Sequence, residues 1–486
     1  MIRLKLSLAA LIAVFLMFPI VQAQVGLTLK VTSPMNDSTV SNPVPIAATA
    51  SGPNPVSEIE VWVNYKEVFQ VSGATLNANV TLPVGSGERF VVQAVDSKGN
   101  IAKVVYSITV VPVGATKPQY VYVGNAGDSS ISVFAVNSNG TLKPLQPRLL
   151  APMCGTPTSL ATAGKILLAA GNYTAVCNPG ELGGALVYLY LIQPSGKLGT
   201  VSQAYENDAE DATLDKLGKL AFTSAASFNP HAFQVSISGW DVSGGNLNTS
   251  LPGSPYMSFF NSTTGTGYLP SALQVATGDH FLYGIFSKYS DFNPTGDGLL
   301  GVMSLLSDGG VGSFVATPIA GCKGTGVSGG SRPVIVVVTL KSETVAYQAC
   351  VKGSTNVIGS SIINTSSGRI TNTYDAFLPP SGTSLIPVAV DAAGEWLAAS
   401  DGSGNIDVLA INQSSGTLSE LPHHIFNVGA NSVAFDRTGK FLYAAQTGKA
   451  AVAAYAFNST TGMVTLPALG SQGTGPSPTV VVVAQP

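Results

Sequence analysis

One short phrase recurs seven times after residue 118 and limits the folds that this chain can adopt. A small or polar residue is followed by Gly, by any residue and then by an aliphatic residue, as in 139–142 (NGTL) and 415–418 (SGTL). Each copy follows an apolar run typical of a strand, and Gly permits the positive φ of a tight hairpin. The glycines of the seven copies, about 45 to 64 residues apart, are Gly140, Gly196, Gly245, Gly309, Gly368, Gly416 and Gly462.

Further apolar runs complete a four-strand pattern around each copy. A second strand precedes each copy, as at 120–123 (YVYV), and a turn such as 436–440 (DRTGK) separates that strand from another apolar strand. Four strands per repeat at this spacing predict the blades of a seven-bladed β-propeller. The first repeat lacks its innermost strand, and the chain ends with 478–483 (PTVVVV). We therefore expect the C-terminal strand to complete the first blade and to close the ring, which leaves no long open sheet edge.

The segment before the repeats divides into three parts. Residues 1–23 have a basic start, an apolar stretch and a Val-Gln-Ala cleavage site, so they predict a signal peptide and a secreted, periplasmic or cell-surface protein. Residues 25–113 place apolar side chains at every second position in short runs, which predicts an immunoglobulin-like β-sandwich of six or seven strands. Residues 114–118 form the predicted linker, and 119–486 the propeller. The expected fold class is therefore all-β.

The composition limits the classes of partner that we expect for this chain. Only 10% of the residues are charged and the net charge is -3, whereas a nucleic-acid-binding surface must be densely basic to neutralise phosphates. No segment after the signal peptide is long and apolar enough to predict a membrane span. We expect no nucleic acid, and no membrane span once the signal peptide is cleaved.

The four cysteines test the repeat model, because disulfides are permitted in an exported chain. The predicted register places Cys154 and Cys322 in loops that enter the second and fifth repeats. Cys177 and Cys350 lie between the second and third strands of the same two repeats, and both kinds of loop fall on one face. We therefore predict the disulfides Cys154–Cys177 and Cys322–Cys350.

The strand residues of the repeats resemble a known family. Residues 120–125 (YVYVGN) leading to 131–136 (ISVFAV), and 441–445 (FLYAA) leading to 453–457 (AAYAF), are similar to lactonase-type seven-bladed propellers with YVTN-like repeats. That family includes 6-phosphogluconolactonase-like proteins, and the resemblance covers about residues 118–486. It implies the propeller fold and a lactone hydrolase. The preceding segment resembles bacterial Ig-like domains, for example at 94–100 (AVDSKGN).

A phosphosugar site would require clustered Arg or Lys side chains to hold the phosphate. After the linker the chain has four arginines, and two of them, Arg369 and Arg437, fall in turns on the face opposite the longer loops. The four are Arg148, Arg332, Arg369 and Arg437. An exported protein would also not meet a cytosolic phosphosugar.

Polar and aromatic side chains of the longer loops are the candidate ligand site, because propeller ligands usually sit at the mouth of the central channel on that face. His231 is a candidate general base if a carboxylate such as Asp291 orients it. A solvated loop histidine is the favoured alternative, because the sequence identifies no orienting partner. The candidate ligand-binding residues are Asn125, Asp128, Asn172, Tyr173, Asn229, Lys288, Tyr289, Arg332, Asp401 and Lys449.

An acidic run at 206–211 (ENDAED) is the densest in this charge-poor chain. Its carboxylates, Glu206, Asp208, Glu210 and Asp211, are candidate Ca²⁺ ligands, because Ca²⁺ prefers several oxygen donors. The run lacks the spacing of a known calcium loop, so a solvated loop is favoured and we expect no required cofactor.

Three functions remain open from the sequence. The leading hypothesis is a monomeric, non-catalytic protein that binds a glycan, peptide or protein through the propeller loop face, because no catalytic motif is recognisable. The second is a lactone hydrolase acting on a sugar-acid lactone, which rests on the family resemblance. The third is a structural or adhesive component of the cell surface, which would assemble or associate tightly with the wall.

Overall fold

The computed structural model describes residues 26–34, 38–111, 118–145, 155–172, 185–206, 209–229, 232–256, 260–261, 266–275, 280–290, 293–294, 297–323, 335–340, 343–352, 355–364, 366–377, 386–400 and 404–486. The chain divides into two compact units, Met1–Lys117 and Pro118–Pro486, called unit 1 and unit 2 below. The described residues are almost all strands and turns, with a short 3-10 helix, η2 (Thr447–Lys449). The predicted signal peptide lies outside them. No helix within the described ranges has the length and hydropathy needed to cross a membrane.

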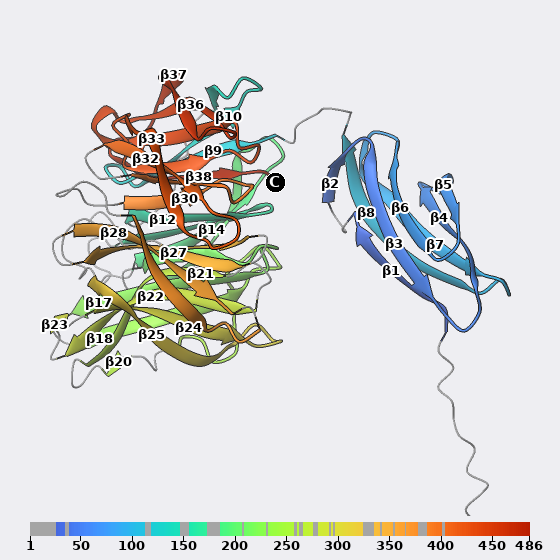
Figure 1. Ribbon diagram of the computed structural model, residues 1–486, viewed down its shortest axis with the longest axis horizontal. Helices are drawn as coiled ribbons and strands as arrows, with labels where there is room; N and C mark the ends of the chain where they lie inside the picture. The colour runs from blue at the N-terminus through green and yellow to red at the C-terminus, as the bar shows by residue number, and fades with distance from the viewer. Residues whose placement is uncertain are drawn as a thin grey trace, which may run out of the picture. The chain divides into compact units, whose positions relative to one another are not determined.

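Unit 1 contains two sheets (Figure 1). The first has the order β1 (Thr28–Ser33), β3 (Val44–Ser51) and β6 (Thr75–Val80). The second has the order β2 (Ser38–Ser41), β8 (Ile101–Val111), β7 (Gly85–Asp96), β4 (Val56–Val63) and β5 (Lys66–Ser72).

The core of unit 1 follows the predicted alternation of apolar residues. Val44 and Ile46 of β3 and Ile59 and Val61 of β4 are fully buried, and they belong to one cluster that both sheets share. Every second side chain of a strand points to the same face, so the intervening residues of β3 remain exposed or half-buried. The two sheets therefore pack face to face as a sandwich.

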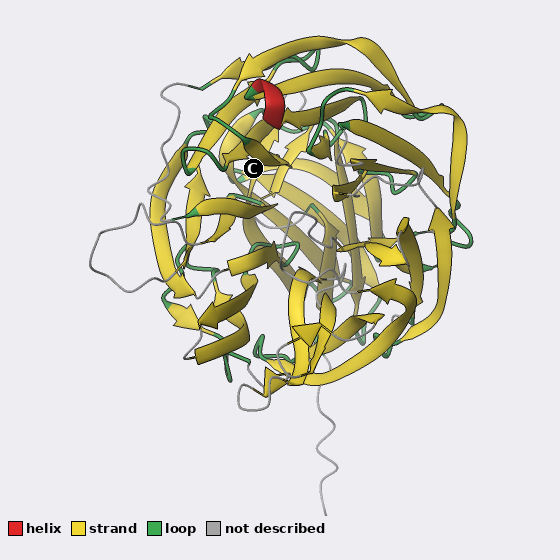
Figure 2. Ribbon diagram, turned by 90° about the vertical axis from the view of Figure 1, so that its left-hand side faces the viewer, coloured by secondary structure: helices red, strands yellow, loops and turns green. Residues whose placement is uncertain are grey.

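Unit 2 is built from antiparallel sheets arranged around a common centre (Figure 2). The first four-stranded sheet has the order β11 (Leu142–Pro144), β10 (Ser130–Val136), β9 (Tyr120–Asn125) and β38 (Pro478–Ala484). The second has the order β12 (Thr156–Ala163), β13 (Ile166–Asn172), β14 (Ala185–Ile192) and β15 (Leu198–Glu206), and the third has the order β16 (Ala209–Leu214), β17 (Leu220–Asn229), β18 (Ala232–Asp241) and β19 (Thr249–Ser250). The two four-stranded sheets near the C-terminus have the orders β30 (Ile386–Val390), β31 (Trp396–Ser400), β32 (Asn405–Ile411) and β33 (Leu418–Asn427), and β34 (Ser432–Phe435), β35 (Phe441–Gln446), β36 (Ala451–Asn458) and β37 (Met463–Gly473).

The fourth and fifth repeats form one larger sheet, which is joined by a single pairing of Lys323 in β25 with Val351 in β27. Its strands are β20 (Phe260–Asn261), β21 (Thr266–Val275), β22 (Phe281–Ser290), β23 (Asn293–Pro294), β24 (Asp297–Leu305), β25 (Val311–Lys323), β26 (Ile335–Thr339), β27 (Thr344–Lys352), β28 (Thr355–Ile363) and β29 (Ile370–Phe377).

The C-terminal strand belongs to the first sheet of unit 2. β38 pairs antiparallel with β9, with Val481 opposite Val123 and Val483 opposite Val121. The sequence predicts this pairing, because the first repeat lacks a strand and the chain ends with one. The first and last strands of unit 2 are thereby hydrogen-bonded neighbours.

The strands nearest the centre of unit 2 contact one another in sequence. We call β38, β12, β16, β21, β26, β30 and β34 the inner strands; each contacts the next, and β34 contacts β38. Side chains supply hydrogen bonds between them: Thr158 Oγ1 donates to Ala209 O (2.9 Å), and Asp211 Oδ2 accepts from Leu273 N (2.7 Å). Val481 N likewise donates to Ser432 Oγ (3.2 Å). Side chains thus join neighbouring sheets where no backbone ladder does.

The seven glycines of the recurring phrase all have a positive φ, between +68° and +83°. This confirms the prediction from the sequence, because only Gly adopts that conformation without strain. Six of them also lie against a side chain of a neighbouring repeat, which an added Cβ would overlap. The six pairs are Gly140–Phe441, Gly196–Tyr120, Gly309–Leu251, Gly368–Phe281, Gly416–Val345 and Gly462–Trp396.

Buried tyrosines fasten neighbouring repeats at the same turns. Each donates a hydrogen bond from its hydroxyl to the carbonyl of a turn glycine, at 2.8–3.3 Å. Burial raises the pKa of each of these tyrosines far above its usual value, so the hydroxyls stay protonated as donors. The pairs are Tyr122–Gly196, Tyr283–Gly368, Tyr347–Gly416 and Tyr443–Gly140.

Candidate functional site

Unit 2 has two ends, which are defined by the strands' connections. The loop end carries the connections between second and third strands and between sheets, including 126–129, 447–450 and 474–477. The turn end carries the short turns after the inner strands, including 215–219 and 436–440.

Asn125, one of the predicted ligand residues, closes β9 at the loop end and is fully buried. Its amide Nδ2 donates to Ser130 Oγ (2.9 Å) and to Ser132 Oγ (3.0 Å). These contacts hold the β9–β10 turn in place. Asn125 therefore belongs to the buried base of the loop end, and its predicted contact with a ligand stays a prediction.

Asp128 and Lys449 flank one segment, residues 474–477, which leads into β38. Asp128 is half-buried and accepts a hydrogen bond from Ser130 Oγ (2.5 Å), and a Cβ added to Gly475 would lie 2.7 Å from Asp128 Oδ1. Lys449 is exposed and ends η2. The next residue, Ala450, accepts from Thr474 N (2.8 Å). The structure thus brings two of the predicted residues to the same part of the loop end.

Among the other candidates, Lys288 is exposed on β22. The backbone of Asn172, Asn229, Tyr289, Glu206, Cys322 and Cys350 is described, but their side chains lie outside the described part. His231, Asp291, Tyr173, Arg332, Asp401, Asp208, Cys154 and Cys177 lie outside it entirely. Their predicted roles therefore stay predictions.

The acidic run is not the solvated loop that the sequence favours. Glu206 ends β15, and β16 begins at Ala209, so Glu210 and Asp211 lie within an inner strand. Glu210 is only 7% exposed, and Asp211 accepts the backbone N–H of Leu273 on the next inner strand. Strand formation is favoured because β16 is buried along almost its whole length, with Ala209, Ala212 and Leu214 in a core cluster shared with the neighbouring sheet. The described residues contain no group of three His, Cys, Asp or Glu placed to hold a metal.

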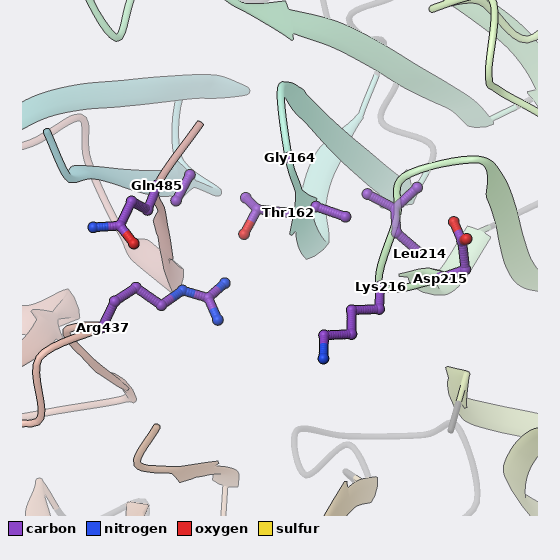
Figure 3. A pocket seen from close by; sticks show the side chains of 9 residues that line it. Thr162, Gly164, Leu214, Asp215, Lys216, Arg437 and Gln485 are labelled. Carbon is purple, nitrogen blue, oxygen red and sulfur yellow. The ribbon is translucent and has the colours of Figure 1, made fainter. Parts of the chain in front are cut away.

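A cavity that the sequence did not indicate opens at the turn end of unit 2. Its volume is about 350 Å³. Arg437 and Lys216 extend from opposite sides of it, Thr162 lies above the gap between them, and Gln485 lies above Arg437 with its amide directed away from the gap (Figure 3). The lining residues are Thr162, Ala163, Gly164, Leu214, Asp215, Lys216, Arg437, Ala484 and Gln485.

The turns that carry the two cations share one construction. Asp215 Oδ1 accepts from the backbone N–H of Lys219 (2.5 Å) and Leu220 (2.7 Å), and Asp436 Oδ1 accepts likewise from Lys440 (2.7 Å) and Phe441 (2.8 Å). Lys216 and Arg437 each follow the turn aspartate directly. Aligning the repeats on this aspartate would have identified both residues from the sequence.

Comparisons with known proteins support both units. A family model for a bacterial Ig domain matches residues 28–91, so unit 1 contains an Ig-like domain. No curated protein has a sequence that matches this chain.

Several solved propeller structures resemble the chain. The periplasmic gluconolactonase of Pseudomonas aeruginosa superposes with a TM-score of 0.56 at 17% identity. A 6-phosphogluconolactonase candidate from Bacteroides uniformis gives 0.54 at 15%, and a protein from Lactobacillus plantarum gives 0.51 at 14%. Each comparison covers 76% of this chain and 100% of the other. At these identities the likeness establishes a propeller-like fold and leaves the chemistry open.

Proposed function

We propose that this chain is an exported protein in which an Ig-like domain is joined to a seven-bladed propeller, and that the propeller binds a ligand without catalysis at its loop end. The observation that carries the proposal is the placement of Asp128 and Lys449. Groups of opposite charge flank one segment, residues 474–477, on a base that Asn125 and its serine partners hold rigid. Such a surface suits a polar glycan, peptide or protein segment, since positioned polar groups fix a ligand's orientation.

A closed ring of seven blades is part of the same proposal. Three observations support it: β38 pairs with β9, the inner strands contact one another in a cycle, and Tyr443 of the last repeat donates to Gly140 of the first. Closure would keep the loop end stiff, because every blade is then supported on both sides. Export is supported by the basic and apolar start of the sequence and by the Ig-like domain.

Hydrolysis of an unphosphorylated sugar lactone is the second candidate. The likeness to a periplasmic gluconolactonase favours it. The shortage of clustered arginines and the predicted export argue only against a phosphorylated, cytosolic substrate. An unphosphorylated lactone needs no phosphate-binding cluster, so these two arguments do not apply to it.

One experiment separates the two candidates. The predicted mature protein from Gln24 onward, prepared without reductant so that the predicted disulfides can form, is mixed with a panel of sugar and aliphatic lactones. Proton release is followed with Ca²⁺ and then with a chelator. The binding proposal predicts no turnover above the uncatalysed rate. Turnover that is lost in His231→Ala or Asp291→Ala would replace it with the lactonase function.

Binding itself is tested on an array of glycans and peptides. We expect the double variant Asp128→Asn, Lys449→Gln to weaken the retained ligand about tenfold or more, because charge-assisted hydrogen bonds are roughly twice as strong as neutral ones. The matched control is Lys143→Gln, which removes an exposed lysine from the outer strand β11. Equal binding by the double variant and the control would contradict the loop-end assignment.

A further inference from the structure

The five-stranded sheet of unit 1 has one face that is turned away from the core. Residues of β4 alternate, so Ile59, Val61 and Val63 are buried in the core cluster while Glu60 and Trp62 point to the opposite side. We call that opposite side the outer face. Trp62 is half-buried and is not one of the residues that form the core cluster among the described residues. The core of unit 1 therefore does not account for this large aromatic side chain.

A second aromatic side chain lies beside the outer face in a backbone conformation that costs stability. Asn64 and Tyr65 join β4 to β5 as a two-residue turn, and both have a positive φ, +48° and +67°. Turns of this type favour Asn-Gly, because a side chain at the second position is strained. Here that position holds a tyrosine that is 78% exposed. Backbone strain of this kind clusters at functional sites, so Tyr65 points to binding rather than to stability.

Arg89 brings the Tyr65 ring to the same face as Trp62. Phe90 of β7 is buried in the core cluster, so the preceding residue, Arg89, points to the outer face. Arg89 Cζ lies 4.7 Å from the centroid of the Tyr65 ring, which is a cation–π contact. The turn is also tied to β7, because Asn64 Oδ1 accepts from Arg89 N (3.0 Å). Two aromatic rings are therefore presented on one side of the sheet.

A row of polar side chains crosses the sheet beside Trp62. We call it the polar row; its members occupy facing positions on β5, β4, β7 and β8 and are Gln70, Glu60, Gln93 and Lys103. Glu60 Oε2 accepts both from Trp62 Nε1 (2.9 Å) and from Gln93 Nε2 (3.1 Å). One carboxylate thus orients the indole ring and the neighbouring amide. Amide, carboxylate and ammonium groups together supply hydrogen-bond donors and acceptors for hydroxyl groups.

We infer that the outer face of unit 1 binds a neutral polysaccharide. A sugar ring has an apolar C–H side that can stack on an aromatic ring, and its hydroxyls can pair with amides and carboxylates. Trp62 and Tyr65 supply two stacking positions, and the polar row supplies the hydrogen bonds. Aromatic side chains beside a few positioned polar groups are the usual composition of a ligand site. Two stacking positions suit a chain of sugars better than a single sugar.

The distribution of charge and of apolar side chains selects this class of ligand. Glu60 and Lys103, which have opposite charges, belong to the same polar row, whereas an acidic polysaccharide would need a mainly positive surface. The exposed side chains of Ile101 and Val105 lie on either side of Lys103, so the polar row divides the apolar part of the face. A protein interface usually has a continuous apolar centre. Both observations favour a neutral polysaccharide over an acidic one and over a protein.

Affinity electrophoresis of the predicted mature protein tests the inference. The native gels contain mixed-linkage β-glucan, xylan or galactomannan as neutral probes and alginate as the acidic probe, and retardation at several concentrations gives the Kd. The variants are Trp62→Ala and Tyr65→Gly. Leu306→Ala removes an exposed apolar side chain from unit 2, and Lys30→Gln removes an exposed lysine from the other sheet of unit 1, so both are matched controls.

We expect at least one neutral polysaccharide to retard the parent and alginate not to do so. Trp62→Ala and Tyr65→Gly should each raise the Kd about tenfold or more, because aromatic anchors dominate binding, and the controls should migrate as the parent does. Glycine suits the turn, so the melting temperature of Tyr65→Gly should lie within about 2 °C of the parent or above it. Binding would then be lost without loss of stability, which a merely structural tyrosine would not show.

The inference is overturned if no neutral polysaccharide retards the parent, if alginate retards it more strongly, or if both variants migrate like Leu306→Ala. The face lies in unit 1 and does not depend on the proposed loop-end function. Retardation that is lost in Asp128→Asn, Lys449→Gln but kept in the two variants would assign the polysaccharide to the loop end instead. Sedimentation of the same proteins covers a protein partner: a parent dimer that becomes a monomer in both variants, with no retardation by any polysaccharide, would make the outer face a self-association surface.

Discussion

Replacing Gly416 by Ala should destabilise unit 2 by about 3 kcal/mol. Gly416 has φ +68°, a region that costs an L-residue about 1–2 kcal/mol. The new Cβ would also overlap Val345 Cγ2 of the neighbouring repeat, and overpacking of this kind costs about 1–3 kcal/mol. The smaller entropy of the unfolded alanine chain offsets about 0.4–1 kcal/mol. A shift at Gly416 would further lengthen the hydrogen bond from Tyr347, which is now 2.8 Å.

Alanine substitutions at two further glycines separate the cost of the positive φ from the cost of overpacking. Gly164 has φ +52° but no heavy atom within 4 Å of an added Cβ, so Gly164→Ala isolates the backbone cost at about 1 kcal/mol. Gly448 has neither a positive φ nor a neighbour within 4 Å. Gly448→Ala should therefore change the free energy of unfolding by less than about 0.5 kcal/mol or stabilise slightly.

Urea unfolding followed by tryptophan fluorescence measures all three variants, because Trp240 and Trp396 both lie in unit 2. The urea concentration at the midpoint should be highest for Gly448→Ala, lower for Gly164→Ala and lowest for Gly416→Ala. The dependence of the unfolding free energy on urea concentration should be the same in all three variants. If Gly416→Ala lost no more stability than Gly164→Ala, the contact between neighbouring repeats would not contribute to stability. The reasoning about the recurring phrase would then be refuted.

Two other predictions concern pH and oxidation. Hydrogen bonding, above all from the Asn100 side chain, lowers the pKa of Asp96 to about 2. The ionised Asp96 side chain therefore stabilises unit 1 above pH ~4, and this stabilisation is lost as the pH falls toward 2. Asp96→Asn should remove this pH dependence from melting curves recorded between pH 6 and pH 2. Peptide mapping without reduction should find Cys154–Cys177 and Cys322–Cys350, each worth roughly 3 kcal/mol, and any other pairing would contradict the repeat register.

The strands and turns of unit 2 were predictable because their determinants are local. A turn glycine needs a positive φ whatever surrounds it, and an apolar run beside such a turn forms a strand. The same local rule predicted that residues 478–483 would supply the missing strand of the first sheet. The alternation of buried and exposed residues in unit 1 was predictable for the same reason.

Contacts between repeats were not predictable, because they join residues far apart in the chain. Asp211 meets Leu273 N only once two inner strands lie side by side, so its sequence neighbourhood suggested a solvated acidic loop. The cavity is a similar case. The sequence did place Arg437 in a turn on the face opposite the long loops, but it did not show that Lys216 comes from another turn to the same cavity. The residues of a turn determine its backbone conformation. Which side chains of different turns meet is determined only when the sheets pack together.

The pairing of β38 with β9 also sets a lower limit on the time in which unit 2 can finish folding. The hydroxyl of Thr479 reaches Gly124 O, 355 residues earlier in the chain. At a synthesis rate of about 5–20 residues per second, roughly 20 to 70 s pass between the appearance of β9 and that of its partner. During that interval β9 presents an unpaired, strongly apolar edge, which is a site for aggregation. We therefore expect β9 to be prone to aggregation until β38 has been synthesised and has paired with it.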